Sequence, residues 1–224
     1  MTTLFGAAIG LALGWIAWLV SQHFAAQYQA VAATPPGTKH LEPREDGGGV
    51  ASVAVLVQTL TALWGAYVGW QVASLAAGAL ALVVTSLLLC IALVDFQVRR
   101  IPNLLVGALL VCAVLQALLL SAPTVPSMVL GLLVGGGAFL LLAIIGRGAM
   151  GMGDVKLAAA IGALLGLPAA LQGLFVGILC GGLAAAILLL TKRVGRKDPM
   201  AYGPWLALGA WVVLVHAWGL WPGQ

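Results

Sequence analysis

The sequence predicts an all-α fold, a polytopic membrane helical bundle of about eight transmembrane helices. Hydrophobic residues make up 62% of the 224 residues and charged residues only 7%, against about 25% charged in an ordinary soluble domain. The apolar residues form long runs rich in Leu, Ala, Val and Gly. These runs approach the roughly 20 residues that a helix needs to cross a bilayer. A soluble fold could not hide this much apolar surface, and a membrane β-barrel would alternate apolar and polar residues.

Charges, prolines and glycine clusters divide the apolar runs into spans. Two of these boundaries are weak. Gln71 alone separates the second run from the third, and only Gly166-Leu167-Pro168 separates the sixth from the seventh. A chain with seven spans is therefore the alternative. The first run is expected to be a span and not a signal peptide, because it lacks a basic leader segment and a small-residue cleavage site. The expected spans are 3–22, 52–70, 73–94, 103–121, 128–146, 155–167, 169–191 and 203–221.

The chain is expected to form one transmembrane domain over 1–224, with 23–51 as a cytoplasmic connector loop. That segment contains "ATPPGTKHLEPREDGGG", whose proline, glycine and charge content cannot bury enough apolar surface to fold alone. No metal site is expected, because the cysteines and histidines are scattered without ligand spacing. These residues are Cys90, Cys112, Cys180, His23, His40 and His216.

The basic residues predict the orientation of the chain. All ten fall in or beside the connections that follow the first, third, fifth and seventh spans. Because basic loops stay cytoplasmic, both termini are expected outside and these connections inside. The ten are Lys39, Arg44, Arg99, Arg100, Arg147, Lys156, Lys192, Arg193, Arg196 and Lys197.

Two of the six acidic residues, Asp95 and Asp154, lie beside apolar runs and not in the polar loops. The predicted topology brings Asp95, at the end of the third span, and Asp154, at the start of the sixth, to the same cytoplasmic face. Each has an ordinary explanation: Asp154 could cap a helix, and Asp95 could pair with Arg99 one turn later. Acids at membrane depth are nevertheless costly and tend to mark function.

Two neighbouring carboxyls can share a proton, since they do not easily ionise together. One then acts as a base on water while the other polarises a carbonyl, as in aspartic proteases. Gly151 and Gly153 could give backbone, substrate and the second carboxyl room to approach Asp154. They could equally serve helix packing, the role expected of the small residues at 131–137 and 177–186.

Three stretches, in order, resemble the type IV prepilin peptidase family, the G-x-G-D membrane aspartic proteases that include preflagellin peptidases. "AMGMGDVKLAAAIGALLG" resembles the G-x-G-D signature, "LVDFQVRRIPN" the first-aspartate segment and "YGPWLALGAW" a late FGPxLALG segment. The resemblance covers roughly residues 75–215 and implies that Asp95 and Asp154 are the catalytic pair.

The resemblance also implies an activity: cleavage of the basic leader peptide from type IV pilin, pseudopilin or preflagellin-like precursors. This would occur at the cytoplasmic face of the inner membrane, with membrane lipid as surroundings and without a cofactor, a metal or nucleic acid. Many bacterial members carry two CxxC pairs that bind zinc between their first two spans, and also methylate the new pilin N-terminus. Because 23–51 contains no cysteine, the chain resembles a peptidase-only form.

Six further residues near the two aspartates are expected to bind substrate or shape the site, and each has an ordinary alternative. Lys156 could snorkel to the membrane interface. Pro102 could set the first turn of the fourth span, and Asn103 is expected to cap that helix. Tyr202, Gly203 and Pro204 could form only a turn and a helix start.

Two other function classes remain open from the residues. A transporter could use the two aspartates as a proton or cation relay, but no internal repeat is evident and the acids are expected near one face, away from the midplane. A non-enzymatic scaffold would tolerate replacement of both. The aspartic endopeptidase is the preferred interpretation.

Overall fold

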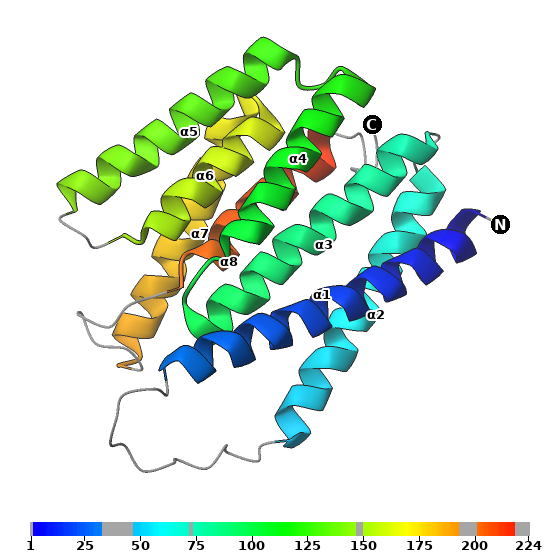
Figure 1. Ribbon diagram of the computed structural model, residues 1–224, viewed down its shortest axis with the longest axis horizontal. Coiled ribbons are helices and arrows are strands. Elements are labelled where there is room, and N and C mark those ends of the chain that lie inside the picture. The colour runs from blue at the N-terminus through cyan, green and yellow to red at the C-terminus, as the bar shows by residue number, and fades with distance from the viewer. Residues whose placement is uncertain (1, 33–46, 72–73, 147–149, 193–200, 218–224) are drawn as a thin grey trace. The chain divides into compact units, whose positions relative to one another are not determined.

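The described part of the chain, in a computed structural model, consists of helices and their connections (Figure 1). The structure describes residues 2–32, 47–71, 74–146, 150–192 and 201–217, and no strand occurs within these ranges. The prediction of an all-α helical bundle is therefore confirmed, and eight helices occur within these ranges. The helices are α1 Thr2–Ala32, α2 Gly47–Gln71, α3 Leu75–Val98, α4 Asn103–Leu120, α5 Val125–Ile145, α6 Met152–Leu165, α7 Ala169–Leu190 and α8 Gly203–Ala217.

Not every helix could cross a bilayer by itself. Within the described ranges, five helices (α1, α3, α4, α5 and α7) are long and apolar enough to do so. By contrast, α6 has 14 residues and α8 has 15. These two short helices carry the G-x-G-D and YGP segments at their N-terminal ends, whereas Asp95 lies near the C-terminal end of the longer α3.

The expected connector 23–51 is wrong at both ends. Helix α1 continues to Ala32 and α2 begins at Gly47, and the residues between them, 33–46, lie outside the described part of the chain. The extension of α1, "HFAAQYQAVA", is rich in Ala and Gln, which are strong helix formers. A polar residue can end an apolar run without ending the helix. The predicted length of α1, taken from its apolar run, was therefore too short.

The chain divides into two compact units, Met1–Ser86 and Leu87–Gln224. In the first unit, α1 packs on α2 through glycines spaced four residues apart. A Cβ on Gly6 would overlap the carbonyl oxygen of Gly65, and one on Gly10 would overlap that of Thr61. Gly14 approaches the Thr61 side chain. This small-residue contact was missed in the sequence, although the four-residue spacing could have revealed it.

In the second unit, α6 is the central helix and contacts α4, α5, α7 and α8. Its side chains at Leu157, Ala160, Ile161 and Leu164 have no exposed surface. A short helix surrounded by others has a fixed position along its axis, since its side chains fit between those of several neighbours. The first turn of α6 contains Asp154, so this packing determines where that carboxyl lies.

Most of the glycines at 131–137 and 177–186 make helix contacts, as expected; Gly137 and Gly182 are the exceptions. Gly131 of α5 lies against the backbone of Gly162 in α6, beside which α5 runs in Figure 1. Gly177 of α7 lies against Leu206 of α8. The turn between α6 and α7 requires a glycine: Gly166 has a φ of +66°, and a Cβ there would lie 2.5 Å from the Cβ of Pro123.

Candidate functional site

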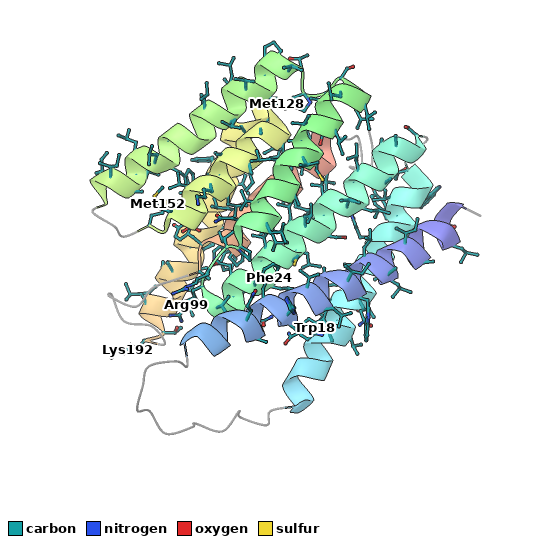
Figure 2. The ribbon with its side chains drawn as sticks, in the orientation of Figure 1. Trp18, Phe24, Arg99, Met128, Met152 and Lys192 are labelled. Atoms are coloured by element: carbon teal, nitrogen blue, oxygen red, sulfur yellow. The ribbon has the colours of Figure 1, made fainter. Side chains whose placement is uncertain are left out.

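The ends of three helices meet at one end of the second unit. Asp95 lies in the last turn of α3, Asp154 in the first turn of α6, and Gly203 is the first residue of α8. In Figure 2, Arg99, Met152 and Lys192 lie toward this end and Met128 lies at the other. The structure thus brings together segments that are about 50 residues or more apart in the chain.

Asp95 is almost completely buried, with 4% of its surface exposed. Its Oδ2 accepts a hydrogen bond of 2.9 Å from the backbone N–H of Gly203. Arg99, which follows the end of α3 with a left-handed φ of 52°, adds an electrostatic interaction with this carboxylate. The sequence offered pairing with Arg99 as the ordinary role of Asp95, but its hydrogen-bond partner comes from α8.

Asp154 is half-buried and does not occupy the capping position of its helix. Gly151 is the N-cap residue, and an atom at the Cβ position of Gly151 would lie 3.5 Å from Oδ2 of Asp154. Asp154 precedes the expected span 155–167 and belongs to none of the five helices that could cross a membrane. Burial and then the charge of Asp95 raise the pKa of Asp154 to about 6, against a smaller opposing effect of the Gly151 backbone.

Ile101 joins the two aspartate segments, a contact that sequence reasoning missed. Its side chain lies 3.3 Å from the Cβ position of Gly153 and 3.2 Å from that of Gly203. Gly153 therefore accommodates Ile101, whereas the sequence interpretation left that space for substrate and the second aspartate. The apolar residue between "RR" and "PN" was the available signal, since it interrupts a polar stretch, and its side chain is half-buried.

Lys156 and Asn103 form a second link between the segments. The Nζ of Lys156 donates a 3.0 Å hydrogen bond to Oδ1 of Asn103, and both side chains are exposed. The expectation that Asn103 caps α4 is wrong: Pro102 is the N-cap residue, without a side-chain cap bond. The carbonyl oxygen of Pro102 accepts the N–H groups of Leu105 and Val106, leaving the Asn103 side chain available for Lys156.

Tyr202, Gly203 and Pro204 form the start of α8, as one of the two readings of the sequence had it. The carbonyl oxygen of Tyr202 accepts the N–H groups of Trp205 and Leu206 at 3.1 and 3.2 Å. Gly203 and Pro204 are buried. Phe96, the residue after Asp95, makes an edge contact with Trp205 at 6.5 Å between ring centroids. This aromatic pair was also missed, although Phe96 adjoins a candidate residue.

The helix ends at this site therefore carry two carboxyls that interact electrostatically. Asp95 accepts the backbone N–H of Gly203, and Asp154 has a raised pKa to which the charge of Asp95 contributes. Such a pair can take up and release a proton between its members. Within the described ranges, no three His, Cys, Asp or Glu side chains lie together as metal ligands would.

Comparisons with known proteins agree with the order of these segments. Residues 82–186 match the type IV leader peptidase family. A Bacillus subtilis protein named prepilin leader peptidase/N-methyltransferase is 34% identical over 142 residues, which is 62% of this chain and 55% of that protein. The protein of the same name from Aeromonas hydrophila is 32% identical over 73% of this chain and 58% of its own length.

A third protein of that name, from Xanthomonas campestris pv. campestris, is 40% identical over 33% of this chain and 25% of its own length. The matched region thus spans little more than half of the Bacillus and Aeromonas proteins. No solved structure matched significantly. Several apolar helices and the family match at 82–186 make this a multi-pass membrane protein. The chain belongs to the type IV leader peptidase family.

Proposed function

We propose that this protein is an intramembrane aspartic endopeptidase that removes the basic leader peptide from type IV pilin or pseudopilin precursors. The observation that carries the proposal is the electrostatic interaction between Asp95 and Asp154 at one end of the second unit, where burial and then the charge of Asp95 raise the pKa of Asp154 to about 6. Hydrolysis of a peptide by two carboxyls needs this interaction, because one must be charged while the other holds a proton.

The proposed reaction follows from this division of charge. One carboxylate accepts a proton from a water molecule as the water oxygen attacks the scissile carbonyl carbon, and the protonated partner donates a hydrogen bond to the carbonyl oxygen. The tetrahedral intermediate then breaks its C–N bond, and the leaving amine takes up a proton from the pair. Either carboxyl can take the role of the proton donor while its partner acts as the base, and the raised pKa of Asp154 brings its protonated form closer to neutral pH.

The substrate and its location are part of the same proposal. The precursor is expected to present its leader at the cytoplasmic face of the inner membrane, with both termini of the peptidase outside, as the distribution of Lys and Arg favours. Gly151, the exposed residue before α6, would leave room for the substrate backbone beside Asp154. The proposal includes no metal or cofactor for cleavage.

The test uses the purified protein in detergent with a recombinant type IV prepilin, and mass spectrometry of the products. Cleavage at a single bond after the leader is expected, and Asp95→Asn and Asp154→Asn should each abolish it while leaving the protein folded. Full cleavage by both variants would overturn the mechanism. A parallel reaction with S-adenosylmethionine tests methylation, which the name of the relatives includes; we propose that this chain performs cleavage without it.

A further inference from the structure

We propose that Gly203 is the positioning residue for Asp95: its backbone N–H holds the carboxylate, and its missing side chain leaves the space in which that carboxylate lies. The inference rests on the proposed peptidase function. Gly203 lies beyond residues 82–186, where the chain matches the family, so the match itself gives the residue no role.

The first observation is the hydrogen bond from the N–H of Gly203 to Oδ2 of Asp95, at 2.9 Å across 108 residues of chain. Gly203 is the first residue of α8, and the first N–H groups of a helix have no partner inside it. Asp95 is 4% exposed, so water has little access to replace this donor. The start of α8 therefore supplies a fixed donor to a carboxylate on another helix.

The second observation is the lack of room for a side chain at this position. A Cβ on Gly203 would lie 2.8 Å from Oδ2 of Asp95, 3.1 Å from its Cγ and 3.2 Å from Cδ1 of Ile101. Two of these three atoms belong to the carboxylate itself. An alanine here would therefore push the carboxylate away from its donor, and the three atoms nearest to its Cβ all belong to side chains.

The third observation separates Gly203 from glycines that serve only packing. Farther along the same helix, a Cβ on Gly209 would overlap the carbonyl oxygen of Gly173 and lie 2.9 Å from Cα of Gly177. Backbone atoms cannot avoid a contact by changing rotamer, so alanine at Gly209 must increase the separation between α8 and α7. Alanine at Gly203 can be accommodated by displacing side-chain atoms of Asp95 and, to a smaller extent, of Ile101. This changes the geometry of the site more than the packing of the helices.

The two substitutions are thus expected to affect different properties. A misplacement of about 1 Å can reduce a rate about 100-fold. Because a Cβ would approach Oδ2 of Asp95 to 2.8 Å, the carboxylate must shift by about half an ångström to restore ordinary contact. We expect kcat for Gly203→Ala to fall by about 10- to 100-fold, with KM within about twofold of the unsubstituted protein.

The experiment compares Gly203→Ala, Gly209→Ala and the control Gly182→Ala, whose Cβ would meet nothing within 4 Å. Each full-length variant is assayed for prepilin cleavage over a range of substrate concentrations and melted in detergent. The inference predicts a loss of kcat with an unchanged melting temperature for Gly203→Ala, a lowered melting temperature for Gly209→Ala, and neither change for Gly182→Ala.

Three results would overturn the inference: cleavage by Gly203→Ala within twofold of the unsubstituted protein, an increase in KM without loss of kcat, or a fall in its melting temperature as large as that of Gly209→Ala. Asp95→Asn distinguishes the two proposals. If Asp95→Asn is inactive while Gly203→Ala is fully active, the peptidase stands and the role of Gly203 fails. If Asp95→Asn retains full cleavage, the proposed mechanism fails first.

Discussion

The substitution Gly131→Ala tests whether the close contact between α5 and α6 holds the central helix in place. A Cβ on Gly131 would overlap the carbonyl oxygen of Gly162 and lie 2.9 Å from its carbonyl carbon and 3.0 Å from Cα of Gly166. Favourable carbon–carbon contacts occur at about 3.5–4.0 Å. Since all three atoms are backbone, the helices must separate by about 0.5–1 Å to accept one methyl group.

The size of the effect follows from two opposing contributions. Overfilling a packed contact costs about 1–3 kcal/mol, and the absence of a movable side chain puts this site in the upper part of that range. Alanine is a better helix former than glycine by about 1 kcal/mol, which offsets part of the loss. The net destabilisation is therefore about 1–2 kcal/mol, or a fall in melting temperature of about 2–8 °C for a chain of this size.

The assay is thermal unfolding in detergent, followed by near-ultraviolet circular dichroism. Gly137→Ala is the matched control, because it lies on the same helix and its Cβ would meet nothing within 4 Å; it should melt at or slightly above the temperature of the unsubstituted protein. Since α6 carries Asp154, Gly131→Ala should also reduce prepilin cleavage. Equal melting temperatures for the two variants would refute the reasoning that backbone contact sets the helix separation.

Three further outcomes are expected. Because the folded-state pKa of Asp154, about 6, exceeds its ordinary value of 3.8, its contribution to stability is fully present below pH 3.8 and is lost as pH rises through about 6. Asp154→Asn should therefore raise the melting temperature more at pH 8 than at pH 5, and a pH-independent change would contradict this. Lys156→Met and Asn103→Ala should each lower stability slightly and, in a double-mutant cycle, show coupling of about 0.5 kcal/mol; additive effects would mean that the hydrogen bond does not contribute. Gly10→Leu should lower the melting temperature by more than Gly10→Ala, since a larger side chain separates α1 from Thr61 further, and equal melting of the two would count against close packing there.

The sequence was a good guide to the number of helices and a poorer guide to their ends. Composition alone excluded a soluble fold, and apolar runs broken by charge and proline predicted the eight helices of the described residues. The helix end at Ala32 was missed because polarity marks where a helix leaves lipid, while the helix itself continues as long as its residues favour it. Asn103 was misassigned because its partner, Lys156, is 53 residues away.

The candidate site was likewise predictable from the sequence only in part. Asp95 and Asp154 could be singled out from the sequence because a carboxyl beside apolar runs is costly and needs an explanation, and the charge distribution predicted one shared face. Whether they interact, which donor holds Asp95 and why residue 203 is a glycine depend on contacts among three helix ends. Sequence patterns report the environment of each residue along its own helix, and only the packing of α6 and α8 in three dimensions brings the N–H of Gly203 to the carboxylate of Asp95.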